Sequence, residues 1–238
     1  MNKFTYELAK SAVAAFEIAE PVVEIGALQY DLPGQSIDLR SLFGGRAYIG
    51  CDLAPGRGVD RIEDITRLTF ADGEVGTLVC VHILEHVWDV FSAFKHIRRV
   101  IKPGGMAIIV CPFNLHIHRF PKDYWRFTDD CMRELMKEYP WLIVGRHGYA
   151  NMPSEVFGIG FNRSSFPDFD QRCSKFKELL QVNAHEPSTV ATRLRMWLGA
   201  GLFRKKYFTS FSNRNDLVLD LVRPAGAGAN ESVRPVQT

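Results

Sequence analysis

The feature that most constrains this fold is a helical pattern between two short apolar runs. Residues 77–84 (TLVCVHIL) and 105–113 (GMAIIVCPF) are typical of buried strands. Between them, apolar residues recur every three or four positions over 87–101, and Pro103-Gly104-Gly105 ends the pattern. A strand, a helix and a second buried strand form a βαβ unit, whose strands are parallel and whose crossover is right-handed. We therefore expect an α/β domain built on a doubly wound, mostly parallel sheet.

Further runs along the chain extend this sheet. The Ala-rich N-terminal stretch before Pro21 has helical spacing. A second helix is expected over 128–139, with Thr128 as its N-cap and acidic residues in its first turn. The other expected strands are 21–27, 47–53, a half-polar 59–65, 141–149 and 216–224.

The interval from residue 151 to 214 breaks this alternation. Helical spacing in 176–182 and 192–203 favours an inserted cap or substrate-recognition segment between the last two strands. The main domain would then comprise 1–150 and 215–224. The Gly- and Ala-rich end, 225–238, is expected to be a disordered tail.

Composition limits the classes of partner. The formal net charge is +2, so nothing indicates nucleic acid, whose binding proteins usually carry a marked basic excess. The sequence has no apolar window long enough to span a membrane and its start does not resemble a signal peptide, which predicts a cytoplasmic protein.

The five cysteines form no C-x-x-C pair and are expected to be buried thiols. The basic segment 193–206 suits a solvated cap helix, a peripheral contact with an anionic membrane, or a phosphorylated carrier.

The expected strands end in residues suited to a nucleoside-like ligand. Ligands of doubly wound sheets bind at the carboxyl ends of the strands. There Asp52 could accept hydrogen bonds from a ribose diol, and Asp64 could accept one from an exocyclic amine. Gly26 would let the backbone approach a ligand closely. Either aspartate alone also suits a turn or a helix cap, but together on successive strands they favour a nucleoside.

At this point residues 22–113 resemble the class I S-adenosylmethionine-dependent methyltransferases. The resemblance lies in EIGALQ, IGCDLAPG, DITRLTFADGEVGTLVCVHILEHV and FKHIRRVIKPGGMAIIVCPF. It implies a Rossmann-like sheet of seven strands in the order 3-2-1-4-5-7-6. The seventh strand would be antiparallel, with 141–149 and 216–224 as the closing pair. The implied cofactor is S-adenosylmethionine.

The resemblance also implies roles for single residues. It assigns Glu24 and Gly26 to the methionine end of the cofactor, Asp52 to the ribose, Leu53 and Asp64 with Ile65 to the adenine, and His82 to the sulfonium region. One departure concerns the first loop, where the second and third glycines of the family pattern are replaced. A dinucleotide site, which needs G-x-G-x-x-G, is disfavoured more by this loss than a methyltransferase site.

Residues 114–130, NLHIHRFPKDYWRFTDD, follow the fifth strand and carry the candidate substrate side. The segment P-x-D-Y-W-R-F-T is similar to one in bacterial methyltransferases linked to sugar or cell-envelope chemistry. Candidate catalytic residues are His86, His116, His118, Asp123, Tyr124 and Arg126. Alternatively, the aromatic residues pack the following helix and Asp123 pairs with Arg126. Spacing within His82/His86 and within His116/His118 would suit a metal, but further ligands are lacking and no metal site is predicted.

The sequence thus predicts methyl transfer from S-adenosylmethionine, to an oxygen of a small molecule or a sugar or glycan. The alternative from another class is a catalytically inactive binding or scaffold protein with the same fold. A nicotinamide oxidoreductase would need a glycine fingerprint that the chain lacks.

Overall fold

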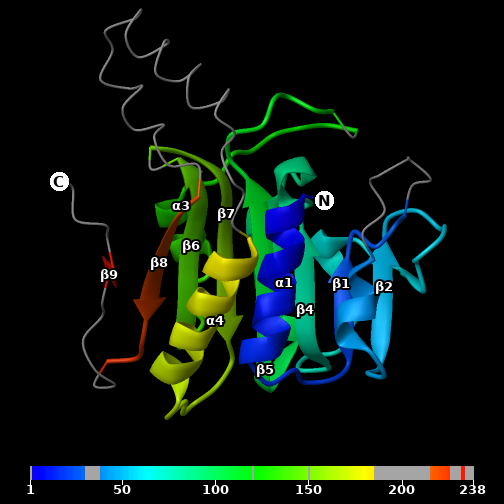
Figure 1. Ribbon diagram of the computed structural model, residues 1–238. Helices are drawn as coiled ribbons and strands as arrows, with labels where there is room; N and C mark the ends of the chain where they lie inside the picture. The colour runs from blue at the N-terminus through cyan, green and yellow to red at the C-terminus, as the bar shows by residue number, and fades with distance from the viewer. Residues whose placement is uncertain are drawn as a thin grey trace, which may run out of the picture.

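One mixed sheet runs through the protein, with helices on both faces (Figure 1). The computed structural model describes residues 2–29, 38–119, 121–149, 151–184, 215–225 and 232–233. The strands are β1 Val22–Ile25, β2 Tyr48–Asp52, β3 Arg61–Ile62, β4 Val75–Val81, β5 Ile101–Pro112, β6 Trp141–Tyr149, β7 Met152–Phe161, β8 Asp216–Val222 and β9 Ser232–Val233. The helices are α1 Lys3–Ala15, α2 Val90–Val100, α3 Asp129–Leu135 and α4 Phe169–Asn183, with 3-10 turns η1 Leu39–Phe43, η2 Ile65–Arg67 and η3 Leu84–His86.

The parallel half of the sheet forms as predicted. β1 lies between β2 and β4 and is parallel to both, while β4 is also parallel to β5. The βαβ unit β4–α2–β5 is present, and Asp89 caps α2 by accepting a hydrogen bond from the Ser92 amide. Thr128 caps α3 through the Cys131 amide, as the sequence predicted.

The antiparallel half corrects the predicted strand assignment. The strand between β5 and β6 is β7, antiparallel to both, and β8 pairs on the outer side of β6. The order 3-2-1-4-5-7-6 therefore holds for β1 to β7 within a sheet that has nine strands among the described residues. The prediction that 216–224 is the seventh strand was wrong, because 152–161 (MPSEVFGIGF) takes that position.

The predicted cap and tail also change. The segment from 151 to 214 begins with a sheet strand and continues with α4, so its first part belongs to the main domain. The rest of that cap, including the basic segment 193–206, lies outside the described residues. In the tail predicted as disordered, Ser232–Val233 form β9 and pair with β8.

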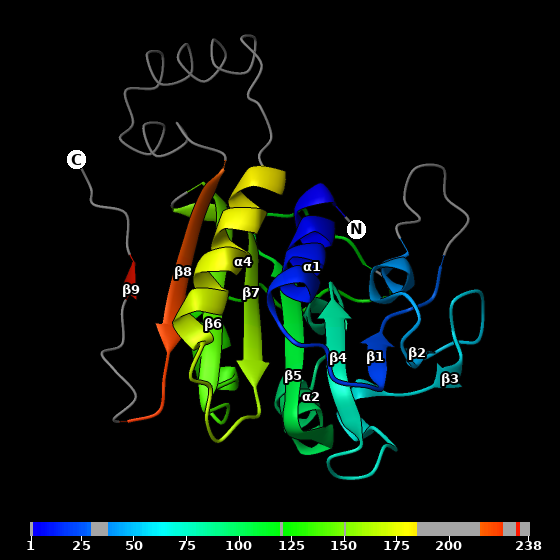
Figure 2. The same ribbon diagram turned by 60° about the horizontal axis from the view of Figure 1, so that its bottom comes forward.

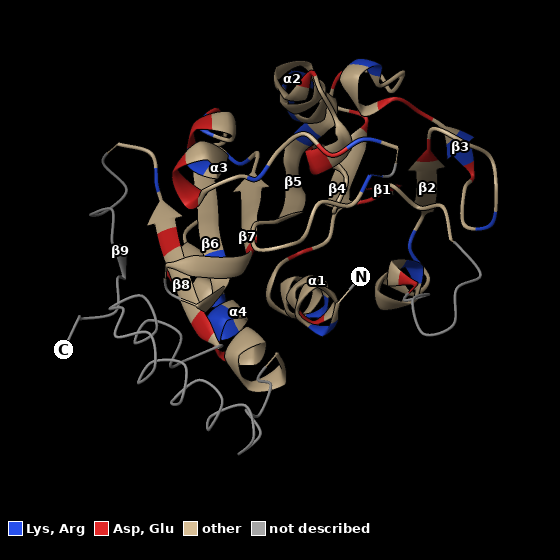
Figure 3. Ribbon diagram, turned by 90° about the horizontal axis from the view of Figure 1, so that it is seen from above, with Lys and Arg blue, Asp and Glu red and all other residues tan. Residues whose placement is uncertain are grey.

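The two faces of the sheet carry separate cores. α1 and α4 cover one face, and α2 and α3 cover the other (Figures 2 and 3). On the first face Leu8, Phe161 and Phe176 are fully or almost fully buried, and on the second Ile97 and Met132 are. Burial on both faces is what makes the central strands apolar throughout.

The cysteines and helices agree with a domain of this kind. All five cysteines are free, and four are buried as predicted, whereas Cys131 is exposed and the prediction was wrong for it. Within the described ranges, no helix is both long and apolar enough to span a membrane.

Gly160 of β7 gives a test of how closely α3 and its following turn pack on the sheet. A Cβ at this position would lie 2.4 Å from Cγ of Tyr139, whose ring is buried. We expect Gly160→Ala to lower the free energy of unfolding by about 1–3 kcal/mol, because the ring has no free space to move into. Urea unfolding measures this. Gly44→Ala is the control, since the nearest atom there is 3.9 Å away. Equal midpoints for the two variants would contradict the packing argument.

Candidate functional site

The predicted cofactor residues lie at one edge of the sheet. The carboxyl ends of β1, β2, β4 and β5, with the loops that follow them, form this edge, which we call the carboxyl edge (top of Figure 1). Glu24 and Gly26 stand at the end of β1, Asp52 and Leu53 at the end of β2, and His82 directly after β4. Parallel pairing of these three strands brings all five residues to this edge.

Glu24 is a poorly solvated carboxylate. It accepts a hydrogen bond of 2.6 Å from the hydroxyl of Tyr48. Burial raises the pKa of Glu24 from 4.5 to about 7, against the lowering effect of the Tyr48 bond. A carboxylate whose charge is disfavoured in this way would gain from a cationic group of a ligand beside it.

Asp52 keeps free acceptor capacity. One of its carboxylate oxygens accepts from the Leu28 amide at 3.2 Å and the other from the Ala54 amide at 3.4 Å. Since a carboxylate offers about four lone pairs, each oxygen retains one for a hydroxyl donor. The neighbouring Leu53 is 70% exposed and can take an aromatic base on its side chain. Both residues fit the roles that the resemblance implies.

The loop after β1 packs against the loop after β2, although it lacks the second and third glycines of the family pattern. The amides of Gly26 and Ala27 donate to the carbonyl of Cys51, and the Gln29 amide donates to that of Arg57. Glycines in the opposing loop after β2 permit this approach, because a Cβ at Gly58 would lie 2.5 Å from the Ala27 carbonyl oxygen.

The space over Gly26 is not open. Gly26 has φ +89°, and a Cβ there would lie 2.2 Å from Cδ1 of Ile83. The sequence predicted a glycine that lets a ligand come close, whereas here a side chain takes that place. A ligand passing over Gly26 therefore requires Ile83 to adopt another rotamer.

Asp64 takes a local structural role, and the side chain of Ile65 is buried in the core. Asp64 caps η2 by accepting from the amide and the hydroxyl of Thr66, at 2.9 and 2.7 Å, and it pairs with Arg67 at 3.1 Å. Burial opposes ionisation, but these bonds prevail and hold the pKa of Asp64 below its ordinary value. The helix-cap alternative is therefore present, and the predicted contact with adenine stays a prediction.

His82 forms a hydrogen bond with a residue that the sequence analysis did not identify as a candidate. It adopts a left-handed conformation, φ 54°, which is uncommon for a residue other than glycine. Its Nε2 lies 2.9 Å from the carboxylate of Glu155 on β7, which also accepts from the Asn2 side chain. Glu155 was missed because 152–161 was not identified as a sheet strand.

Three further side chains meet at this edge. Glu85 is fully buried, and neither carboxylate oxygen has a hydrogen-bond partner among the described residues. Its Oε1 lies 3.8 Å from Nε2 of His86 and 3.9 Å from Nε2 of His118. Burial raises the pKa of Glu85 to about 7. The sequence spacing had paired His82 with His86 and His116 with His118, but the fold instead brings His86 and His118 to one carboxylate and leaves His116 exposed.

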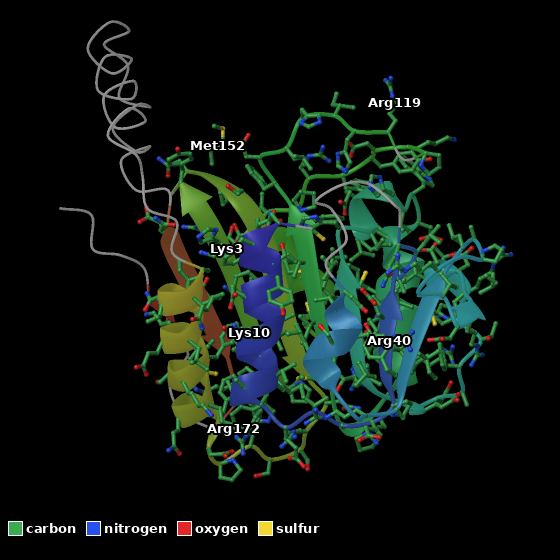
Figure 4. The ribbon with its side chains drawn as sticks, turned by 45° about the vertical axis from the view of Figure 1, so that its right-hand side comes forward. Lys3, Lys10, Arg40, Arg119, Met152 and Arg172 are labelled. Carbon is green, nitrogen blue, oxygen red and sulfur yellow. The ribbon has the colours of Figure 1, made fainter. Side chains whose placement is uncertain are left out.

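Arg126 organises the loop that follows β5. Its guanidinium binds Asp123 through two hydrogen bonds of 2.5 and 2.8 Å and also donates to three carbonyl groups, those of Leu115, His116 and Trp125. The ion pair that the sequence left as an alternative is thus present. Arg119 projects away from the sheet near the tip of this loop (Figure 4).

Aromatic side chains line the outer part of the same loop. Tyr124 and Trp88, 38% and 68% exposed, have ring centroids 5.4 Å apart. Trp125 stacks on Trp88 and donates its indole N–H to the Val87 carbonyl, while Phe127 is buried in the core. The packing alternative therefore applies to Phe127 and Trp125, whereas Tyr124 and Trp88 present ring surface to solvent.

Comparison with known proteins gives one matching family profile. Residues 8–109, from α1 into β5, match the profile of a family described as a methyltransferase domain. This match spans less than half of the chain and supports a methyltransferase domain within these residues. No curated protein matches the chain.

Solved structures to which part of this chain is similar include three methyltransferases, each with a TM-score below 0.5. One is a SAM-dependent methyltransferase from Thermotoga maritima, with 18% identity over 67% of this chain and 90% of the other, and a TM-score of 0.48. Another, from Aquifex aeolicus, has 13% identity over 66% and 93%, with a TM-score of 0.44. The third is the Burkholderia thailandensis 1,6-didemethyltoxoflavin-N1-methyltransferase with bound S-adenosylhomocysteine, with 14% identity over 67% and 79% and a TM-score of 0.49.

Glu24 should make stability depend on pH. Since its folded pKa is about 7 against 4.5 for the ordinary group, the folded state loses stability as pH rises between these values. A glutamine at this position would stay neutral and could still accept from Tyr48. We expect Glu24→Gln to match wild type near pH 4.5 and to exceed its free energy of unfolding by about 1–3 kcal/mol above pH 7. Urea unfolding at several pH values measures the difference, and a pH-independent difference would contradict the assignment.

Proposed function

We propose that this protein is an S-adenosylmethionine-dependent methyltransferase acting on an oxygen of a small molecule or of a sugar or glycan. The proposal is carried by one observation. Within the segment that matches a methyltransferase domain, the carboxylates of Glu24 and Asp52 stand at the ends of adjacent parallel strands. Asp52 has free acceptor capacity for the ribose hydroxyls of the cofactor, and Glu24 has a carboxylate suited to its ammonium group.

Different residues of the chain would bind different parts of the cofactor. Asp52 would accept hydrogen bonds from both ribose hydroxyls, and Leu53 would pack on the adenine. Glu24, together with the backbone at Gly26, would hold the amino acid end, where an ammonium group would compensate the half-buried carboxylate. When bound, the cofactor supplies a methyl group already activated on a sulfonium. The protein then contributes mainly by fixing the acceptor in line with that methyl group.

The acceptor side favours a ring-bearing hydroxyl compound. Tyr124 and Trp88 offer exposed ring faces beside the loop after β5. The imidazoles of His86 and His118 lie near each other, since both are within 4 Å of the Glu85 carboxylate. Without a bound metal ion, either imidazole could take the proton of a hydroxyl group. Such a base contributes on the order of 10²–10⁴-fold in rate. This combination supports oxygen over nitrogen as the atom methylated.

The expectations on partners and location belong to the same proposal. We infer a small-molecule or glycan acceptor and no nucleic acid partner, in a cytoplasmic protein. Contact with a membrane through 193–206 stays a prediction, because that segment lies outside the described residues.

The contact between Ile83 and Gly26 favours the second candidate, a non-catalytic binding or scaffold protein. In that case the cofactor would bind weakly or not at all to a folded chain. Calorimetry with S-adenosylmethionine, followed by a screen of hydroxyl compounds for a mass gain of one methyl group, separates the two candidates. Binding with turnover supports the enzyme, and a folded sample that does neither supports the scaffold.

The assignment of Asp52 can be tested by substitution. We expect Asp52→Ala to weaken S-adenosylmethionine binding by about tenfold or more, since two hydrogen bonds to a charged acceptor are lost. Calorimetry gives the dissociation constants. Asp72→Ala is the matched control, because Asp72 is exposed before β4, at the opposite edge, and pairs with Arg99. Equal affinity for the Asp52 variant and wild type would refute the ribose assignment.

Glu24 should couple cofactor binding to pH. Because the carboxylate must be ionised to pair with an ammonium group, wild-type affinity should rise as pH increases toward about 7. The rise approaches about tenfold per pH unit well below that pKa. In Glu24→Gln the slope should be much smaller, although the ligand's own amino group titrates equally in both proteins. Parallel slopes for the two proteins would remove Glu24 from the cofactor site.

A further inference from the structure

We propose that Glu85, His86 and His118 form a binding site for a divalent first-row transition metal ion such as Zn²⁺ or Co²⁺. One ligand atom from each residue lies within 4.8 Å of the other two. Glu85 and His86 come from η3 after β4, while His118 comes from the loop after β5. The site is therefore assembled by the fold from two separate segments at the carboxyl edge.

The separations fit a metal after small side-chain movements. Oε1 of Glu85 lies 3.8 Å from Nε2 of His86 and 3.9 Å from Nε2 of His118. Bonds of about 2.0–2.2 Å to nitrogen and oxygen in a tetrahedral site place the ligand atoms about 3.4 Å apart. Each histidine ring therefore needs only a small movement toward a shared ion.

Both imidazoles are oriented from behind. Nδ1 of His86 lies 2.5 Å from the carbonyl oxygen of Lys122. Nδ1 of His118 lies 3.3 Å from the His116 carbonyl oxygen and 3.3 Å from the Asp123 carboxylate. These acceptors favour the tautomer with hydrogen on Nδ1, which leaves the Nε2 lone pair toward Glu85. Metal-binding histidines are usually held in this way, by an oxygen acceptor on the nitrogen that does not face the ion.

Glu85 provides an independent reason to expect a cation. Its side chain is fully buried, and neither oxygen accepts a hydrogen bond from another residue in the part of the chain that the structure describes. Burying an unsatisfied carboxyl group is costly, so such groups are normally paired or bound to metals. The guanidinium of Arg126, whose charge acts on Glu85, is already bound by Asp123. A metal ion is the partner that would satisfy the carboxylate and the two imidazole nitrogens together.

Two histidines and one carboxylate leave coordination positions open, as in catalytic rather than structural metal sites. The open positions suit an oxygen ligand. If the proposed function holds, that ligand would be an oxygen of the methyl acceptor, held beside the ring faces of Trp88 and Tyr124. With the ion bound, both imidazoles are ligands, so the ion and not a histidine would favour ionisation of the acceptor hydroxyl. This last step rests on the proposed methyltransferase activity, whereas binding of the metal does not.

Titration of the chelator-treated full chain with Co²⁺ tests the site. We expect one equivalent to bind with visible ligand-field absorption, and Zn²⁺ to displace it. Glu85→Gln and His118→Asn should each weaken Co²⁺ binding by at least about tenfold. His116→Asn is the matched control and should bind like wild type, because His116 is exposed, lies outside the cluster of ligand atoms and only packs its ring edge-on against that of His118.

Circular dichroism and S-adenosylmethionine calorimetry on the same samples separate the possible failures. Since Glu85→Gln changes a buried group and could disturb folding, the His118 variant, in a surface loop, decides the test if it melts like wild type. No Co²⁺ binding by folded wild type, or equal binding by His118→Asn and His116→Asn, would overturn the metal site. S-adenosylmethionine binding that persists in that case leaves the proposed function standing.

Discussion

The pairing of β1 between two parallel neighbours is the constraint on which the site depends. Glu24 lies opposite Gly50 of β2 and Val79 of β4, so the three strands reach the carboxyl edge together. This register brings Glu24, Asp52 and His82 to one edge although they are far apart in the sequence. A slip of one residue would turn Glu24 to the other face of the sheet. The chemistry of the edge is thus a consequence of backbone hydrogen bonding along β1.

The strands and helices whose patterns are local were predictable from the sequence. The period of α2 and the Pro-Gly-Gly that follows it define β4–α2–β5, and Thr128 marks the start of α3. β7 was not predictable in the same way. Its glycines at 158 and 160 lower strand propensity, yet the structure needs them because the side chains of Met136 and Tyr139 pack on them. That requirement is tertiary, and it is invisible in the sequence of the strand.

The candidate site was predictable for Asp52 and Glu24, because an acidic residue at the end of an expected strand is enough to identify each of them. It was not predictable where partners come from distant segments. Tyr48 donates a hydrogen bond to Glu24, and Glu155 forms a hydrogen bond with His82. The side chain of Ile83 lies over Gly26. Each of these contacts exists only because the sheet brings distant segments together. Grouping the histidines by spacing failed for the same reason, because the fold joins His86 to His118 through a buried glutamate.

Two glutamates at the carboxyl edge, half-buried Glu24 and fully buried Glu85, differ from the other glutamates of the core. Glu63 and Glu155 are also buried but are paired, with Arg61 and His82, whereas burial raises the pKa values of Glu24 and Glu85 to about 7. A core selected for stability alone would have apolar residues at these positions, since burying a carboxylate is unfavourable. Among the described residues, Glu24 accepts from one neutral hydroxyl, and Glu85 lies near two imidazoles without a hydrogen bond to either. Neither carboxylate is fully compensated by the protein itself, so ligands that bring positive charge would stabilise the folded state and be held at the edge where the strands end.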